Sequence, residues 1–201
     1  MTKPQIPFEP GNLYHVFNHA SSDESLFVEH KNFHRFLMNY KRYIVPIADT
    51  FAYCLMPNHF HMLVRIKDSA VISKLPTKKL DETAYVAHQF GNLQNAYARY
   101  FNIKNQRKGP LFQWRIKRKK IDSGAYFKQA VQYIHMNPVY HEFVDHPDDW
   151  KYSSYPAYNS SRETLVKRDD FISFIGGKEA FYNIHKLKGI EKYSIDMNVF
   201  Y

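Results

Sequence analysis

The chain of 201 residues is long enough for one domain, or for one domain with a small appendage. With 44% hydrophobic and 23% charged residues, its composition is that of a globular protein. The single cysteine, Cys54, excludes an internal disulfide and a zinc site built from four thiolates. The longest apolar run, residues 51–56, is too short to span a bilayer, which takes about 20 residues, and the N-terminus has no apolar signal core. We therefore expect a cytoplasmic protein with no membrane partner.

The charge and the aromatic content point to a class of partner. The 28 lysines and arginines outnumber the 19 acidic residues, which gives a formal net charge of +9, and the chain also holds 16 Tyr, 16 Phe and 2 Trp. A basic and aromatic surface suits a polyanion that carries bases, which is nucleic acid. The alternative is a basic protein whose charge only keeps it soluble.

The first half of the chain predicts a strand and a helix, followed by a hairpin of two strands. Residues 13–18 are β-prone, and residues 30–44 place apolar side chains at helical spacing. Residues 47–55 form a buried strand in this interpretation. Residues 59–66 form the next strand, after a turn at Pro57 and Asn58.

The second half predicts a helix, a strand and a helix. An apolar stripe runs through residues 83–102, and Gly109-Pro110 then breaks the chain. Residues 111–121 alternate as a strand does. Asp122 or Ser123 can cap a helix over residues 123–136, which Pro138 is expected to end.

The predicted order β-α-β-β-α-β-α begins as a split βαβ, ferredoxin-like fold. We therefore expect an α+β protein with an antiparallel sheet, helices mainly on one face, a further helix over 123–136 and a C-terminal appendage. The domain boundaries are placed at 1–158 for the main domain and 159–201 for the appendage, where residues 171–187 can hold one more helix.

Two histidines, His59 and His61, flank Phe60 on a predicted strand. Residues two apart on a strand point to the same face, so Phe60, Met62 and Val64 face the core while the imidazoles lie side by side on the other face. Two imidazoles at this spacing can bind one metal ion. The alternative is a pair of surface histidines on a half-exposed strand.

The segment from 104 to 120 carries no acidic residue and eight basic ones, which are Lys104, Arg107, Lys108, Arg115, Lys117, Arg118, Lys119 and Lys120. If Phe112, Trp114 and Ile116 face the core, the opposite face is cationic and suits a phosphate backbone. The alternative is a solvated edge strand protected by its lysines. Trp114 can pack in the core, which we expect, or stack on a base.

In the helix predicted over 123–136, Tyr133 lies at the edge of the apolar stripe, four residues before Asn137. A tyrosine there can project its hydroxyl into a cleft. On pattern alone, an amphipathic tyrosine at the boundary of the core is the favoured explanation.

Together these segments resemble a known family. The stretches YHVFNH (14–19), YCLMPNHFHMLVR (53–65), GPLFQWRIKRKKID (109–122), YIHMNPV (133–139) and WKYSSY (150–155) are similar to those of the single-tyrosine HUH transposases, above all the REP-associated tyrosine transposases. The resemblance covers about residues 10–158, in matching order. One departure is His19-Ala20, where relatives often carry Arg-Gly.

The resemblance implies a catalytic set and a reaction. It assigns the nucleophile to Tyr133 and the metal ligands to His59, His61 and Asn137, with Mg²⁺ or Mn²⁺ as the cofactor. The implied substrate is single-stranded DNA with hairpin elements, cleaved and rejoined through a 5′-phosphotyrosine. We expect this chain to act as a monomer or a homodimer.

Three functions remain open from the sequence. The first is a DNA-nicking and strand-transfer enzyme, a tyrosine transposase. The second is a catalytically silent DNA-binding or regulatory module with the same fold. The third is an RNA-binding ferredoxin-like domain that stacks bases on its sheet. The histidine pair, Tyr133 and Asn137 favour the first, because a sheet that only stacks bases has no use for them.

Overall fold

The computed structural model describes residues 6–22, 24–76 and 80–186. Residues 187–201, which include the end of the expected appendage, lie outside the described residues. The elements are β1 (Leu13–His19), α1 (His30–Tyr43), β2 (Ala48–Met56), β3 (His59–Ile66), α2 (Ser69–Ile72), α3 (Glu82–Lys104), β4 (Lys117–Ile121), α4 (Gly124–Tyr140), the short 3₁₀ helix η1 (Pro147–Asp149), α5 (Tyr155–Asn159), α6 (Arg168–Ile175) and α7 (Lys178–His185).

The four strands form one antiparallel sheet in the order β2-β3-β1-β4. In this order β3 lies between β1 and β2, and β1 lies between β3 and β4, so two βαβ units interlock. The expected α+β, ferredoxin-like fold is thereby confirmed. No helix among the described residues is long and apolar enough to cross a membrane.

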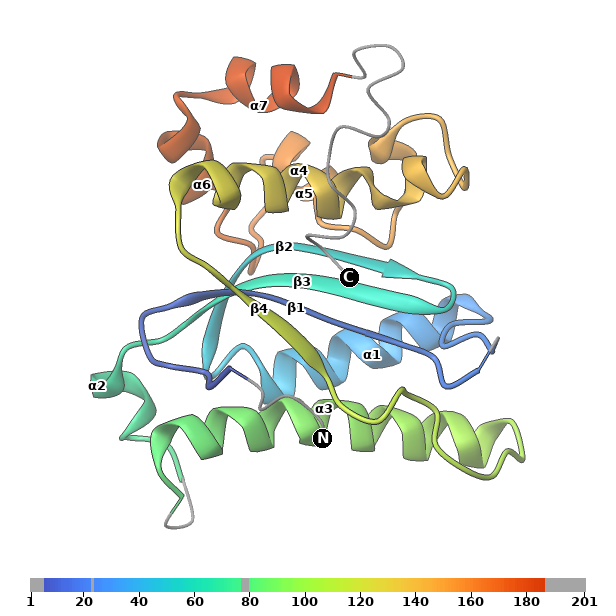
Figure 1. The fold of residues 1–201 in the computed structure, drawn as a ribbon. Coiled ribbons are helices and arrows are strands. Elements are labelled where there is room, and N and C mark those ends of the chain that lie inside the picture. The colour runs from blue at the N-terminus through green and yellow to red at the C-terminus, as the bar shows by residue number, and fades with distance from the viewer. Residues whose placement is uncertain (1–5, 23, 77–79, 187–201) are drawn as a thin grey trace.

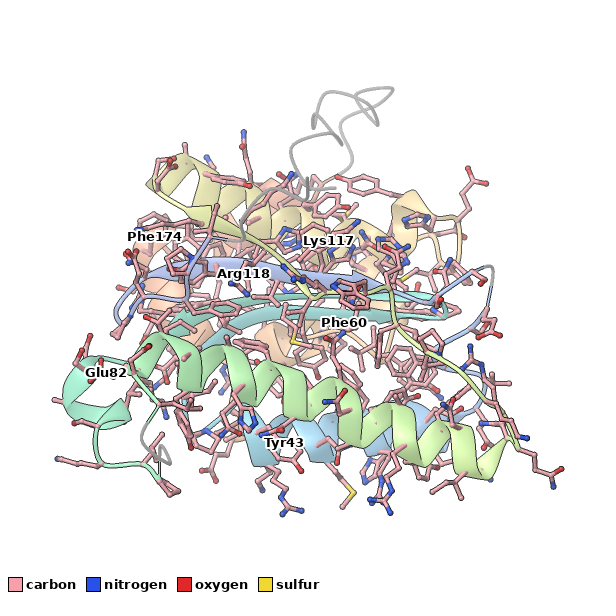
Figure 2. The ribbon with its side chains drawn as sticks, turned by 60° about the horizontal axis from the view of Figure 1, so that its bottom comes forward. Tyr43, Phe60, Glu82, Lys117, Arg118 and Phe174 are labelled. Atoms are coloured by element: carbon pink, nitrogen blue, oxygen red, sulfur yellow. The ribbon has the colours of Figure 1, made fainter. Side chains whose placement is uncertain are left out.

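The molecule has three layers, with the sheet in the middle (Figure 1). Helices α1 and α3 cover one face and share an apolar cluster with the side chains that β3 directs toward them. Phe60 lies between the sheet and α3 (Figure 2), as the strand alternation predicts. Asp81 begins α3 by accepting a hydrogen bond from the Ala84 amide at 2.8 Å.

The other face of the sheet is covered by α4, with α5, α6 and α7 packed beyond it (Figure 1). Residues 159–186 therefore belong to the same apolar cluster as α4, to which they contribute Val166, Phe171 and Phe181. An isolated bridge also joins Val166 to Thr50 of β2. The sheet consequently has an apolar layer on both faces, and the second layer holds the helix that carries Tyr133.

The strand predicted over 111–121 is shorter than expected. Strand β4 begins only at Lys117, because the backbone before it turns back to the end of β1, where Phe112 forms an isolated bridge with Ala20. Phe112 and Ile116 are buried, but Trp114 is 89% exposed. The expectation that Trp114 packs in the core was therefore wrong.

Helix α4 does not end before Pro138, as was expected, but continues to Tyr140. A proline inside a helix removes one hydrogen bond and crowds the preceding turn, a cost that other contacts must offset. Here residues 133–139 are all buried, and the His141 amide donates to the Asn137 carbonyl at 3.0 Å. Tertiary packing thus holds Asn137 in helical geometry, one turn after Tyr133.

Candidate active site

The strand register gathers histidines on the face of the sheet that α4 covers. β1 and β3 pair so that His19 lies opposite His59 and Phe17 opposite His61. Directly opposite residues of antiparallel strands share a face, so His15 and His19 join the pair on β3. The His19 and His59 rings stack at 5.0 Å, and the His59 and His61 rings lie 5.1 Å apart.

Helix α4 places Tyr133 and Asn137 against these imidazoles. Its first turn is held by Ser123, whose Oγ accepts from the Tyr126 amide at 3.2 Å. The Asn137 Oδ1 lies 2.8 Å from the His59 Nε2, and the Tyr133 ring packs edge-on to the His61 ring with centroids 5.4 Å apart. The phenol, the carboxamide and the two imidazoles are thus brought together from β3 and α4.

The side chain of Tyr133 is completely buried. Its ring lies among His15, His61 and Tyr140, at centroid distances of 6.0, 5.4 and 6.3 Å. The tyrosine therefore sits deeper than the stripe-edge position suggested by the sequence. A phosphate can reach its hydroxyl only if the packing around it opens.

Burial keeps the imidazoles of this cluster neutral. It lowers the pKa of His59 to about 3 and that of His15 to about 3, and it lowers the pKa of His61 well below the usual range. The neighbouring histidines lower the pKa of His59 further, while its contact with Asn137 opposes the shift. Neutral imidazole is the form that binds a metal ion.

The contacts of His59 suit a bound cation. Its Nδ1 lies 2.8 Å from the Asn58 Oδ1 and its Nε2 lies 2.8 Å from the Asn137 Oδ1, yet a neutral imidazole has only one N–H to donate. With both amide oxygens facing the ring, one of the two contacts brings two lone pairs together, and a cation held by His59 Nε2 and Asn137 Oδ1 would satisfy these two atoms. Two ligands at right angles on one ion, each about 2.1 Å away, lie about 3 Å apart.

The amide oxygen is the necessary third donor of such a site. Among the described residues, no group of three His, Cys, Asp or Glu side chains is placed to hold a metal ion. His59, His61 and Asn137 offer two nitrogens and one oxygen, a mixed set that matches ions which accept both donor types. The buried Asn137 Nδ2 has no hydrogen-bond partner among the described residues, which fits an amide oriented by its oxygen.

The sequence reading missed three further histidines at this site. The Nε2 of His15 lies 2.9 Å from the Nδ1 of His61, His19 stacks on His59, and the ring of His141 lies 5.1 Å from that of His59. The alternation of β1 could have indicated His15 and His19. The spacing of four residues from Asn137 could have indicated His141.

The eight basic residues of the segment 104–120 do not form one surface. Lys104 pairs with Glu29, Arg107 with Glu24, and Lys120 with Glu9. All three carboxylates come from the N-terminal part of the chain, so these partners could not be recognised within the basic segment. Arg118 is also engaged, because its guanidinium donates to the Ile6 carbonyl and lies 4.1 Å from the centre of the Phe8 ring.

Two of the remaining cations, Lys117 and Lys119, lie on the same face of the sheet as the histidines. β4 pairs with β1 so that Lys117 lies opposite Phe17 and Lys119 opposite His15, on the α4 face of the sheet. Arg118 points to the other face of the sheet. The side chains of Lys117 and Arg118 are labelled in Figure 2. The charge of Lys117 contributes to the lowered pKa of His19, after burial. Lys117 and Lys119 are thus the residues of the basic segment that share the candidate site's face of the sheet.

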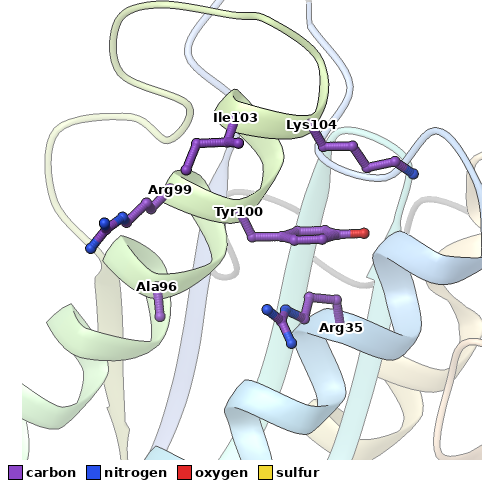
Figure 3. A pocket seen from close by; sticks show the side chains of 6 residues that line it. All are labelled: Arg35, Ala96, Arg99, Tyr100, Ile103 and Lys104. Atoms are coloured by element: carbon purple, nitrogen blue, oxygen red, sulfur yellow. The ribbon is translucent and has the colours of Figure 1, made fainter.

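A cavity of about 360 Å³ lies on the opposite layer of the molecule, between α1 and α3 (Figure 3). The guanidinium of Arg35 lies 4.9 Å from the centre of the Tyr100 ring there. Its lining residues are Arg35, Ala96, Arg99, Tyr100, Ile103 and Lys104. Since α1 and α3 cover the far face of the sheet, this cavity is separate from the histidine cluster.

Fold and geometry thus define an α+β protein that carries a histidine pair on a central strand and a tyrosine on a covering helix. No family model matches the chain. A Haemophilus influenzae protein with the provisional name REP-associated tyrosine transposase is 28% identical over 109 residues, which are 53% of this chain. The match spans only 58% of that protein's length.

A solved structure has the same fold. It is described as a REP-associated tyrosine transposase bound to a REP hairpin, and it superposes with a TM-score of 0.60 at 15% identity. The alignment covers 82% of this chain and 90% of the other. Both comparisons confirm the predicted resemblance: this chain is similar to the REP-associated tyrosine transposases in sequence and in fold.

Proposed function

We propose that this protein is a transposase-like enzyme that cleaves and rejoins single-stranded DNA beside a hairpin. One observation carries the proposal: Tyr133 and Asn137 of α4 lie against His59 and His61 of β3. The relatives support the same function, since both are named as tyrosine transposases and one was solved with a hairpin.

Tyr133 would be the nucleophile. Its phenolic oxygen attacks the scissile phosphorus, so that a bond forms between Tyr133 Oη and phosphorus while the bond from phosphorus to the 3′ oxygen breaks. The phenol releases its proton to water, and the departing 3′ oxygen takes one up. The phosphoester energy is kept in the 5′-phosphotyrosine, and attack by a 3′ hydroxyl on that bond then rejoins a strand.

His59, His61 and Asn137 would hold a divalent cation, Mg²⁺ or Mn²⁺. When bound, such an ion supplies Lewis-acid polarisation of the scissile phosphate. The chain's own contribution is to keep both imidazoles neutral through burial and to direct the Asn137 oxygen at His59. Lys117 and Lys119, on the same face of the sheet, would contact neighbouring phosphates of the strand.

The burial of Tyr133 adds a requirement to this mechanism. Because the side chain has no exposed surface, the reaction needs a local shift of α4 or of the groups packed on it. We expect DNA binding to promote that shift, since the bound strand would reach the imidazoles from the end of the sheet where His19 and His59 lie.

A covalent-adduct assay tests the proposal. The protein is incubated with labelled hairpin DNA carrying a single-stranded flank and Mn²⁺, and adducts that survive denaturation are counted on a gel. Tyr133→Phe should abolish the adduct and leave DNA affinity within about twofold. Tyr126→Phe, on the same helix, is the matched control and should form the adduct normally. An equal adduct in Tyr133→Phe would show that another residue is the nucleophile.

A catalytically silent DNA-binding module is the second candidate. The complete burial of Tyr133 favours it, because an inactive protein has no need to expose the hydroxyl. The same assay separates the two functions: hairpin binding without any adduct, in the presence of Mg²⁺ or Mn²⁺, would identify the silent module.

A further inference from the structure

The most exposed large apolar side chain among the described residues is Trp114, at 89%. Tryptophan is usually among the best-buried residues because its indole offers a large apolar area to pack. The next most exposed are Val28 and Ile103, both aliphatic and both at 70%. An indole left in water indicates a surface that another molecule covers.

The backbone holds Trp114 in a fixed position. Phe112 and Ile116 are both buried, so the chain is anchored in the core on each side of the indole. The Gln113 amide donates to the His19 carbonyl at 2.9 Å, and the Asn18 side chain donates to the Gln113 carbonyl at 3.2 Å. Only the three residues 113–115 project, and the indole is displayed without the entropy cost of ordering a long loop.

This projection adjoins the candidate active site. Gln113 is bonded to His19, whose ring stacks on that of His59 at 5.0 Å. Trp114 therefore directly follows Gln113, whose backbone is hydrogen-bonded to His19 at the edge of the histidine cluster. A strand with its phosphate at His59 would pass this projection within a nucleotide or two, since each nucleotide spans several ångströms.

The charges beside Trp114 favour a nucleic-acid partner over an apolar one. Lys108, Arg115 and Lys117 are exposed, and none of them takes part in an ion pair found among the described residues. An aromatic ring flanked by available cations is the combination that binds single strands, with the ring stacking on a base and the cations on phosphates. A protein partner for an exposed indole would require apolar neighbours, and the projection supplies Gln113 and Arg115 instead.

We propose that Trp114 stacks on an unpaired base of the single-stranded flank next to the scissile phosphate, while Arg115 and Lys117 contact the phosphates on either side. This inference rests on the proposed function for the identity of the substrate. It assigns to this chain a base-binding subsite outside the histidine, tyrosine and asparagine set.

The test measures binding separately from chemistry. Tyr133→Phe serves as the background, so that no adduct forms, and the ligand is a hairpin with a short single-stranded flank. Adding Trp114→Ala should weaken binding by about 5- to 100-fold, the range expected for one stacked base. Trp114→Phe should retain most of the affinity. Ile103→Ala removes another exposed apolar side chain, on α3, and should have no effect.

The ligand identifies the contact. Tryptophan fluorescence should be quenched on binding in Tyr133→Phe but not in the double variant, which keeps only Trp150. The affinity difference between these two proteins should disappear on a hairpin without the flank or with abasic flank positions. Equal affinity of the two proteins for the flanked hairpin would overturn the stacking proposal, as would an equal loss on the bare hairpin. If the adduct nevertheless forms, only the subsite is wrong. If wild type binds no DNA, the proposed function fails as well.

Discussion

At the scale of single residues, the contact between His15 and His61 would decide which nitrogen of His61 is open to the proposed metal ion. The two facing atoms are the Nε2 of His15 and the Nδ1 of His61, 2.9 Å apart and fully buried. For His61 to present a lone pair on Nε2, it must carry its proton on Nδ1 and donate it to His15. His15 would then be a positioning residue that selects the metal-binding tautomer.

Replacing His15 tests this role. His15→Phe keeps an aromatic ring in the core but removes the acceptor, and we expect the affinity for Mn²⁺ to fall by about 10- to 100-fold, as for other residues that orient metal ligands. His15→Gln restores an acceptor oxygen and should recover part of the loss. Calorimetric titration with Mn²⁺ measures the affinity, and circular dichroism checks the fold. If His15→Phe binds Mn²⁺ with wild-type affinity, His15 is not a positioning residue of the site.

The candidate residues differ in how far the sequence could place them. His59 and His61 were predicted on one face because strand alternation is local, and the register confirms their position. That Tyr133 and Asn137 approach them was expected from the resemblance alone, since no local pattern relates α4 to β3. His19 was noted only as a departure from related sequences, yet it stacks on His59. Its place depends on the pairing of two distant strands.

At the scale of elements, α7 is fastened to α4 by a chain of neutral hydrogen bonds. The His185 Nδ1 donates to the Phe181 carbonyl at 2.8 Å, so its Nε2 can accept from the His135 Nδ1 at 3.1 Å. The His135 Nε2 then accepts from the Ser154 hydroxyl at 2.8 Å, a shorter contact than that of the same hydroxyl with the Tyr53 carbonyl at 3.3 Å. Each link uses one proton, and the chain is complete only while both imidazoles are neutral. Burial lowers the pKa of His185 to about 4 and that of His135 well below the usual range.

This chain predicts that acid destabilises the protein. Because the pKa of His185 is lower in the folded state than its ordinary value of 6.5, the unfolded state takes up the proton first as the pH falls. The stabilisation is present above about pH 6.5 and is lost toward pH 4, at a cost of about 3 kcal/mol for this residue. His185→Phe should therefore reduce the fall in the free energy of unfolding between pH 7 and pH 4.5, measured by urea denaturation.

The exposed His34 supplies the control for that experiment. His34→Phe makes the same substitution at an exposed position of α1 that is not part of a buried cluster. The buried His15 and His59 remain in both variants, so acid will still destabilise them, and the comparison isolates His185. An unchanged pH dependence in His185→Phe would mean that α7 is held without this chain of hydrogen bonds.

The bounds of a helix or strand could be predicted where no distant contact overrides the local sequence pattern. β3 was predicted with its observed bounds because its alternation and the preceding turn agree. Two predictions failed where distant contacts override the local rule. Helix α4 continues through Pro138 because residues 133–139 are buried, and β4 starts late because residues 111–113 bind the end of β1 instead. The spacing of Phe112 and Ile116 in the sequence is that of one face of a strand. In the structure these two side chains anchor the two ends of a projecting turn.

At the scale of the whole molecule, folding divides the basic segment into engaged and available cations. Glu9, Glu24 and Glu29 come from the chain's first thirty residues and pair with Lys120, Arg107 and Lys104. The net charge of +9 is therefore a poor measure of the binding surface. What counts is which cations are left facing the candidate site, and this follows from the sheet register and from ion pairs over long sequence distances.

The salt dependence of DNA binding measures the number of available cations. Each lysine or arginine that contacts a single-stranded phosphate contributes about 0.7 to the slope of log affinity against log salt concentration. If all three contact phosphates, replacing Lys108, Arg115 and Lys117 together by glutamine should therefore reduce the magnitude of this slope by about 2. Fluorescence anisotropy with a flanked hairpin, from low to moderate salt, gives the slope directly.

A charge-matched variant makes this measurement specific. The triple replacement of Lys41, Arg42 and Lys74 by glutamine removes the same net charge, but from exposed positions at the C-terminal end of α1 and after α2. If the strand runs along β4 and the Trp114 projection, this control should keep nearly the full slope, because only direct phosphate contacts release bound counterions. Equal slopes for the two triple variants would mean that DNA responds to the overall charge of the protein and that no defined path crosses the α4 face. A larger loss in the control would place the strand on the α1 side of the sheet, far from His59 and Tyr133.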